Sequence, residues 1–197
     1  MSGPMTLFQL AGADQTPPAL ADAQLVLIDM QNEYLEGPLA VSGVGDAVAH
    51  TADLLAAARQ VGAGIIHVVH KGYPGSLFDR EAPRGQIIDA LAPLAGEEVI
   101  EKALPNAFAG TGLGDLLRAR GAKELIVVGF MSHMCVSSTV RAALDEGFRV
   151  TVDADGCGSR DLPDGRGGVV VADVVSDVAL VELSDRFAVV VRDHAWR

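Results

Sequence analysis

The chain has 197 residues, of which 49% are hydrophobic, and a formal net charge of −11. This length fits one compact domain with a substantial core. The acidic balance excludes binding to a nucleic-acid backbone, because there is no surplus of Lys and Arg to displace counterions from phosphates. The apolar runs are too short to span a membrane, and the N-terminus lacks the pattern of a signal peptide. We therefore expect a soluble, cytoplasmic protein with no membrane partner, in which Cys135 and Cys157 are free thiols.

The first part of the chain is irregular. Residues 1–23 contain prolines and show no hydrophobic period, which predicts an N-terminal arm over the surface or onto a neighbouring subunit. Residues 24–197 are predicted to form a single domain, because no linker, repeat or low-complexity segment divides them. Its expected elements begin with a strand at 24–29 that ends in Asp29, a helix at 46–61, a strand at 65–70 and a loop at 71–84 that lines a pocket.

The rest of the chain continues the alternation of helices and strands. The expected elements are a short helix at 86–91, a strand at 98–102, a helix at 113–120, a strand at 125–128, a helix from Cys135, a strand at 148–152, a glycine-rich loop at 155–168, a helix at 169–183 and a strand at 188–191. Strands that alternate with helices at this spacing indicate βαβ units. The predicted fold class is α/β, doubly wound, with a six-stranded, mostly parallel sheet and helices on both faces in three layers.

The segment 124–147 joins a strand to a helix through a short turn. A β-branched apolar run stops at Gly129, and a helical period begins at Cys135. A thiol in the first turn of a helix meets free N–H groups and the positive end of the helix dipole, which favour the nucleophilic thiolate. Considered alone, Cys135 fits equally well as a small hydrophobic residue packed at the corner between strand and helix.

Three reactive side chains fall at the ends of different predicted strands. They are Asp29, Lys102 and Cys135. Ligands of open α/β sheets bind outside the carboxyl ends of the strands, so the topology can bring these residues together. Taken singly, Asp29 fits a turn or cap and Lys102 a solvated strand end. Their coincidence at one sheet edge predicts a reactive site.

Three motifs in order link this pattern to a known family. They are Leu27-Ile-Asp29-Met-Gln31-Asn32; Lys102 followed by Asn106-Ala-Phe108 and Thr111; and Gly129-Phe-Met-Ser-His-Met-Cys135-Val136. With these motifs the chain resembles the isochorismatase-like cysteine hydrolases, the superfamily that also contains nicotinamidases and various amide and carbamoyl hydrolases. The resemblance covers most of the chain beyond residue 23.

The resemblance implies that Asp29, Lys102 and Cys135 form a catalytic triad with Cys135 as nucleophile. It also implies a cis peptide bond between Phe130 and Met131, and an oxyanion hole made by the N–H groups of Met131 and Cys135. Lowering the pKa of a thiol from ~8.5 to ~6 needs roughly 3.4 kcal/mol, and a helix terminus supplies ~0.3–1 kcal/mol. We therefore expect Lys102 to supply the missing positive charge, and Asp29 to act as the base.

Further side chains near the motifs are candidates for the substrate pocket. They are Gln31, Tyr34, His70, Phe78, Phe108, Met131 and Met134. For the apolar members, ordinary core packing is at least as good an interpretation. Of the remaining histidines and cysteines, we interpret His67 as a core residue, His50 and His194 as surface residues, His133 as part of the catalytic turn, and Cys157 as non-catalytic.

Nicotinamidases hold a divalent metal with an Asp-x-His pair just after the second strand. Gly72 and Pro74 stand at the corresponding positions here, so the resemblance predicts neither a metal nor another cofactor. True isochorismatases lack the cysteine nucleophile, and Cys135 therefore favours amide hydrolysis over vinyl-ether cleavage.

The sequence thus predicts a metal-independent cysteine hydrolase that cleaves the C–N bond of a small molecule through a thioester and releases ammonia or an amine. The alternatives are an isochorismatase-type hydrolase of a non-amide substrate, and a catalytically silent small-molecule-binding protein with the same fold. The resemblance also implies a homo-oligomer, either a dimer or a tetramer.

Overall fold

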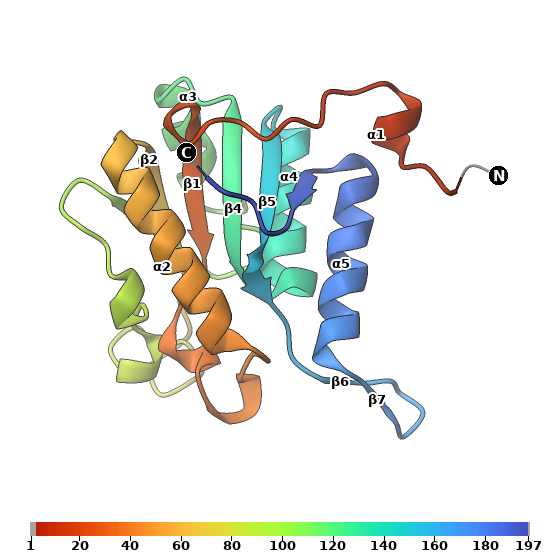
Figure 1. The fold of residues 1–197 in the computed structure, drawn as a ribbon. Helices are drawn as coiled ribbons and strands as arrows, with labels where there is room; N and C mark the ends of the chain where they lie inside the picture. The colour runs from red at the N-terminus through yellow and green to blue at the C-terminus, as the bar shows by residue number, and fades with distance from the viewer. Residues whose placement is uncertain (1–2, 197) are drawn as a thin grey trace.

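A central sheet of six strands organises the molecule (Figure 1). A computed structural model describes residues 3–196, and the strand order is β3-β2-β1-β4-β5-β8 with every neighbouring pair parallel. The strands are β1 (Ala23–Ile28), β2 (Gly64–His70), β3 (Glu98–Lys102), β4 (Glu124–Phe130), β5 (Arg149–Gly158) and β8 (Val189–Val191). The order reverses between β1 and β4, and the crevice at such a switch point is where open α/β sheets bind ligands. The predicted fold class is confirmed.

Helices cover both faces of this sheet (Figure 1). One face packs against α2 (Val44–Val61), and the other against α3 (Leu113–Ala119), α4 (Ser137–Asp145) and α5 (Ala172–Arg186). Successive side chains of a strand point to opposite faces. Leu25 and Leu27 accordingly lie in the core on the α2 side, whereas Val26 and Ile28 lie in the core under the other helices. Continuous apolar runs such as 25–28 are therefore buried on both faces.

The strand β5 is longer than the sequence predicted. The loop expected at 155–168 begins only after Gly158, because β5 shifts register beside Gly129 and continues, so that Cys157 and Gly158 pair with Gly129 and Phe130. The glycines that suggested a loop allow close packing instead. A Cβ atom on Gly156 would lie 2.6 Å from the side chain of Val128.

Two expected helices have different bounds from those predicted. The helix expected at 169–183 begins at Ala172, because Val169–Val170 (β7) pairs with Leu162–Pro163 (β6) in a small antiparallel hairpin. Of the helix expected at 86–91, only Asp89–Leu91 is helical, as one 3-10 turn. The backbone of Ile87 instead bridges to Gln31.

The N-terminal arm packs on its own chain. It contains a one-turn helix, α1 (Leu7–Leu10), and the Leu7 N–H donates to Oδ1 of Asp185 on α5 at 2.8 Å. Arg149 of β5 donates to the backbone carbonyl groups of Asp14 and Thr16. Met1, Ser2 and Arg197, at the ends of the predicted arm and domain, lie outside the described residues. Within residues 3–196, no helix combines the length and apolar character needed to cross a membrane.

Candidate active site

Three strand ends position the predicted triad. Asp29 follows β1 with a left-handed φ of 52°, and Lys102 is the last residue of β3. Cys135 lies in a π-helical turn, Ser132–Val136, that joins β4 to α4. The helix expected to start at Cys135 thus starts three residues earlier as this wider turn. A left-handed φ is uncommon for a non-glycine residue and clusters at functional sites.

The lysine ammonium group links the three side chains. Nζ of Lys102 lies 2.7 Å from Oδ2 of Asp29 and 3.3 Å from Sγ of Cys135. The exposed fractions of Asp29, Lys102 and Cys135 are 0%, 2% and 5%. The structure therefore brings together all three residues that the sequence placed at separate strand ends.

Gly129 allows the catalytic turn to approach β1. Its φ is 131°, and a Cβ atom at this position would lie 2.1 Å from the carbonyl oxygen of Ile28. Only glycine fits such a close backbone contact without displacing one of the two central strands. One residue later, the peptide bond between Phe130 and Met131 is cis. The chain then enters the turn that carries Cys135.

Burial determines the protonation state of the nucleophile. Burial and the negative charge of Asp29 raise the pKa of the Cys135 thiol to about 12, and the opposing attraction of Lys102 is smaller. Burial also raises the pKa of Asp29, again against the attraction of Lys102. The expectation that Lys102 lowers the pKa of the thiol overall is therefore wrong. In the resting site Cys135 is a neutral thiol, and a carboxylate of raised pKa is a stronger base for its proton.

His70 and Gln31 support the site rather than line an open pocket. Nδ1 of His70 lies 3.3 Å from Nζ of Lys102, and burial together with that lysine lowers the pKa of His70 to about 4. A neutral imidazole can accept a hydrogen bond from the ammonium group. Gln31 is fully buried, and its amide bonds to the backbone of His70 and to the Gly85 carbonyl. Gln31 therefore joins the backbone at His70 to the backbone at Gly85 and is not free to contact a substrate, which corrects its prediction as a pocket residue.

The other predicted pocket residues separate into three groups. Tyr34 is buried, with its ring 5.3 Å from that of Phe78 and 5.6 Å from that of Phe130. Phe108 stacks on Phe148 at 5.9 Å and packs against the core under α3 and α4. Met131, which is buried, and Met134, which is exposed, belong to the turn that carries Cys135. Phe108 therefore packs in the core, as its alternative interpretation predicted, and is not a pocket residue.

The remaining histidines and the second cysteine have structural partners. His67 is buried and bonds to Glu97 at 2.9 Å, as expected for a core histidine. His50 is half-buried at the surface and bonds to Asp153 at 2.8 Å. Nδ1 of His133 lies 3.0 Å from Oγ of Ser159. Burial raises the pKa of Cys157 to about 12, which suits an inert thiol.

Asp29, His70 and Cys135 also offer three potential metal ligands. Their ligand atoms all lie within 4.8 Å of one another. The Lys102 ammonium group, however, contacts each of these residues. A metal ion bound there would have to displace a buried cation, so the donor set fits a lysine-centred site better than a metal centre.

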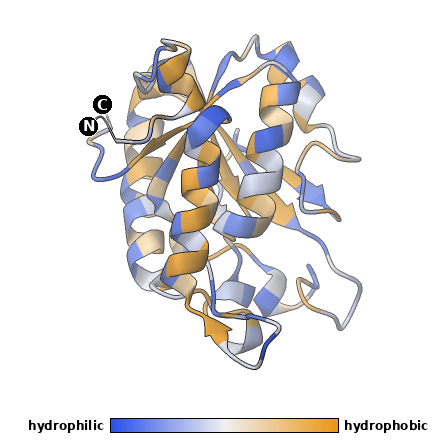
Figure 2. Ribbon diagram, turned by 90° about the vertical axis from the view of Figure 1, so that its right-hand side faces the viewer, coloured by the Kyte–Doolittle hydropathy of each residue, from blue (hydrophilic) through white to orange (hydrophobic). Residues whose placement is uncertain are grey.

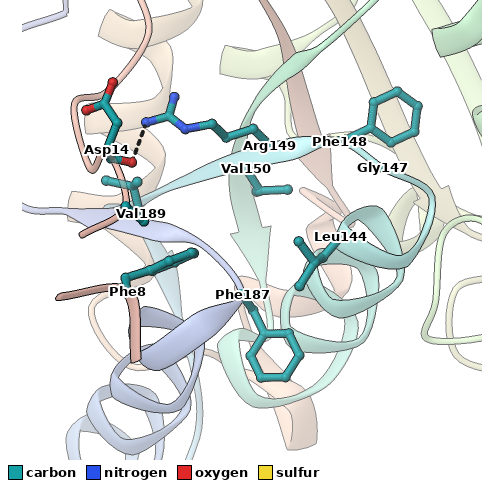
Figure 3. A pocket seen from close by; sticks show the side chains of 10 residues that line it. Phe8, Asp14, Leu144, Gly147, Phe148, Arg149, Val150, Phe187 and Val189 are labelled. Atoms are coloured by element: carbon teal, nitrogen blue, oxygen red, sulfur yellow. Dashed lines mark hydrogen bonds between the residues drawn. The ribbon is translucent and has the colours of Figure 1, made fainter. Parts of the chain in front are cut away.

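A large apolar cavity lies at the other edge of the sheet. It has a volume of about 420 Å³ and is lined by residues such as Phe8, Leu144, Phe148 and Phe187, with Arg149 at its side (Figure 3). These residues belong to the arm, to the start of β5 and to the ends of α4 and α5. The cavity therefore opens at the amino ends of the strands, away from the triad.

One charged residue at the triad's edge of the sheet is not predicted from the sequence. Arg160 follows β5 by two residues, next to Ser159, which contacts the catalytic turn through His133. The segment was interpreted as part of a glycine-rich loop, and no periodicity singles out Arg160. A signal that could have found it is the position of a basic residue just after a strand of a parallel sheet.

Comparisons with known proteins agree with this arrangement. A model of the isochorismatase domain matches residues 23–193. The crystal structure of an isochorismatase from Pseudomonas putida is 47% identical, with a TM-score of 0.93 over 96% of this chain and 97% of that one. A secreted isochorismatase effector of Verticillium dahliae is 40% identical, over 89% of this chain and 92% of its own. A maleamate amidohydrolase of Pseudomonas putida is 31% identical, over 69% of this chain and 72% of its own.

Proposed function

Because the chain belongs to the isochorismatase family of hydrolases, we propose that it cleaves the C–N bond of a small amide through a thioester on Cys135. The observation that carries this proposal is the contact of one buried ammonium group with both a carboxylate and a thiol, at 2.7 Å and 3.3 Å. This arrangement supplies a nucleophile, a base and a fixed positive charge in one buried site.

In the first half-reaction, Asp29 takes the proton of the Cys135 thiol while Sγ attacks the carbonyl carbon. The thiol and the carboxylate lie within 4.8 Å, close enough for direct transfer after small adjustments. The N–H groups of Met131 and Cys135 are proposed to stabilise the resulting oxyanion. Among residues 3–196, the Met131 N–H has no hydrogen-bond acceptor, which leaves it available for this role.

The tetrahedral intermediate then collapses. The C–N bond breaks, the proton held by Asp29 passes to the leaving nitrogen, and ammonia or an amine departs from a thioester. In the second half-reaction, Asp29 takes a proton from water, the hydroxide adds to the thioester carbon, and the C–S bond breaks. The thiol regains its proton and a carboxylic acid leaves.

Two alternatives are weaker on chemical grounds. Cleavage of a vinyl ether does not use a thiol nucleophile, and it leaves the contact between Lys102 and Cys135 without a role. A silent binding protein does not need a thiol beside a base of raised pKa. The name of the similar maleamate amidohydrolase, by contrast, states hydrolysis of an amide.

A screen for ammonia release across small carboxamides tests the proposal. Mass spectrometry of the quenched reaction should detect the acyl group of the active substrate on the peptide that contains Cys135. Turnover without such an adduct under single-turnover conditions would argue for direct attack by water. A panel in which no amide reacts and Cys135 alkylates no faster than a model thiol would favour the silent alternative.

The pH dependence of kcat/KM follows from the two raised pKa values. Asp29 must be ionised to take the proton, so kcat/KM for a neutral amide should fall as the pH drops through the pKa of Asp29, which lies above the ordinary 3.8. The pKa of Cys135 is about 12. No second limb is therefore expected near ~8.5, where free thiols ionise. Steady-state rates over a broad pH range check this, and a rise centred on that value would instead indicate a thiolate mechanism.

We also propose that the protein is a homo-oligomer that contacts a second copy through α5. Figure 2 views the side of the molecule on which this helix lies. Exposed valines recur along this helix at spacings of four and three residues, which is the pattern of a helix–helix seam: Val174, Val178 and Val181. The flanking acids Asp177 and Glu182 pair with arginines of the same chain, so two copies would not repel each other there.

Solution scattering should give a multiple of the 20.5 kDa chain mass, and the Val178→Glu variant should give the monomer mass. A monomeric wild type would contradict the proposal.

A further inference from the structure

Two carboxylates and an imidazole meet where β5 shifts register against β4. Val152 and Ala154 point into the core under α3, α4 and α5, so Asp153 and Asp155 point to the α2 side. Nε2 of His50, on α2, lies 2.8 Å from Oδ2 of Asp153. One ligand atom from each of His50, Asp153 and Asp155 lies within 4.8 Å of the other two. An irregular strand thus directs three potential ligands to one point, as bulges near functional sites commonly do.

The two carboxylates lack a permanently charged partner. Asp153 is fully buried and Asp155 is half-buried. Asp153 accepts hydrogen bonds from the Trp196 ring and from the Asp155 N–H, which are neutral donors. Among residues 3–196, no Lys or Arg lies within ion-pair distance of either carboxylate, and His50 is positive only when its ring is protonated. Like charges held close together with little water are costly unless a cation is shared between them.

A small cavity adjoins the cluster. Its volume is about 140 Å³, and its lining includes His50 together with His194 and Trp196 of the C-terminal segment. A water molecule takes up about 30 Å³ of liquid volume. The cavity therefore provides room for an ion together with the water molecules that complete its coordination.

A buried hydroxyl group beside the cluster has no partner. Thr51 follows His50 on α2 and is fully buried, and its Oγ1 has no hydrogen-bond partner in the described part of the chain. This oxygen lies against β5, because a Cβ atom on Gly156 would be 2.9 Å from it, and Gly156 directly follows Asp155. A buried polar group without a partner is costly. Water bound to an ion at the cluster would satisfy the hydroxyl group.

We propose that His50, Asp153 and Asp155 bind a divalent transition-metal ion such as Zn²⁺. Imidazole and carboxylate groups are both ordinary Zn²⁺ ligands, and ligand atoms at about 2.0–2.2 Å from the ion lie roughly 3–3.5 Å apart. The 2.8 Å between His50 and Asp153 is close to that spacing, so the ion can replace their hydrogen bond after a small movement. The cluster at the nucleophile differs, because Lys102 occupies its centre.

Such an ion would stabilise the C-terminal segment. After β8 the chain crosses the α2 side of the sheet (Figure 1). There the N–H of Asp193 donates to Oδ2 of Asp155 at 2.6 Å, and Nε1 of Trp196 donates to Oδ2 of Asp153. An ion that fixes the two carboxylates also fixes both acceptors of this segment. The role is structural and does not depend on the proposed hydrolysis.

Trp196 provides a direct probe of the site, because it is the only tryptophan in the chain and its ring bonds to Asp153. Protein treated with EDTA and freed of the chelator is titrated with Zn²⁺ and, separately, with Co²⁺. Tryptophan fluorescence should change saturably, with one ion bound per chain, and Co²⁺ should quench it and gain visible absorption bands. At about 100 times its Kd, Zn²⁺ should raise Tm by about 5–10 °C.

Substitutions locate the ion. His50→Gln and Asp155→Asn each remove one ligand, and each should weaken Zn²⁺ binding at least ~10-fold. The matched control is Asp46→Asn, which removes the same charge from the exposed first turn of α2, outside the cavity, and should leave Kd unchanged. Cys135→Ala removes the thiol of the active site and should leave Kd unchanged as well. Circular dichroism verifies that each variant is folded.

Three results would overturn the site. An equal loss of affinity in Asp46→Asn and Asp155→Asn would mean that the ion is only attracted by the net charge of −11. A loss in Cys135→Ala would place the ion at the nucleophile instead. Tryptophan fluorescence and Tm that respond to neither ion would mean that a proton on His50 supplies the positive charge. None of these results bears on amide hydrolysis, so the proposed function is tested separately.

Discussion

Replacing Cys135 with Ala is expected to reduce kcat for any amide found in the ammonia screen on the order of 10⁴-fold or more, because no other group can form the thioester. The substitution removes one sulfur atom from a buried position at the strand–helix turn. It leaves the ion pair of Lys102 and Asp29 in place, so the variant should remain folded. Steady-state ammonia release and mass spectrometry of the acyl-enzyme provide the two measurements.

Cys157→Ala is the matched control for this loss. Cys157 is also a buried thiol, but it lies on β5 opposite Gly129. It takes no part in the contacts of Lys102 with Asp29 and Cys135. Its replacement should leave kcat within a few-fold of the wild-type value. Full activity in Cys135→Ala, or equal losses in both variants, would show that the sulfur of Cys135 is not the nucleophile.

The sequence predicted the central sheet better than its borders, for a physical reason. Apolar runs such as 25–28 and 125–128 are buried on both faces, and burial depends directly on residue type. The hairpin of β6 and β7 depends instead on polar contacts of particular side chains. Asp164 accepts two backbone N–H groups in its turn, and Asp161 caps the start of α5. The apolar pattern over Val169–Val170 does not reveal such contacts and therefore predicts a helix there.

The site shows the same division between residue type and three-dimensional environment. Asp29, Lys102 and Cys135 were identified because strand ends converge at one edge of a parallel sheet. The pKa of the thiol was predicted in the wrong direction, because burial of Cys135 outweighs the attraction of Lys102 and burial cannot be read from a motif. Gln31 was assigned to the pocket by proximity in the sequence, although its amide is used by the backbone of His70 and Gly85.

The buried ion pair gives the second large expected effect. Asp29→Asn should destabilise the fold by about 3–5 kcal/mol, because it leaves the Lys102 ammonium group buried without a countercharge. Lys102→Met should cost less, since the remaining carboxyl group already has a raised pKa and can become neutral. Both variants should lose activity. Asp29→Asn lacks the base that takes the thiol proton, and Lys102→Met lacks the positive charge of the site. Urea unfolding monitored by circular dichroism measures the two losses of stability.

The pH dependence of stability provides an internal control for this pair. A carboxyl group whose pKa is higher in the folded than in the unfolded state stabilises the fold fully below its unfolded pKa, and this contribution disappears as the pH rises through the folded pKa. The loss in the free energy of unfolding of Lys102→Met, relative to the wild type, should therefore be smaller in acid than at neutral pH. A deficit that is constant with pH would mean that lost packing of the lysine stem, rather than the unpaired carboxylate, causes the destabilisation.

The double variant Asp29→Asn/Lys102→Met separates the structural from the catalytic role of the pair. With both charges removed, no unpaired ion remains, so it should be more stable than the sum of the single losses predicts, by roughly 1–3 kcal/mol. Activity should stay absent, because stability restored without Asp29 provides no acceptor for the thiol proton. Additive losses would show that the two charges do not interact in the folded protein. Recovery of stability together with measurable amide turnover would instead remove Asp29 from the role of base.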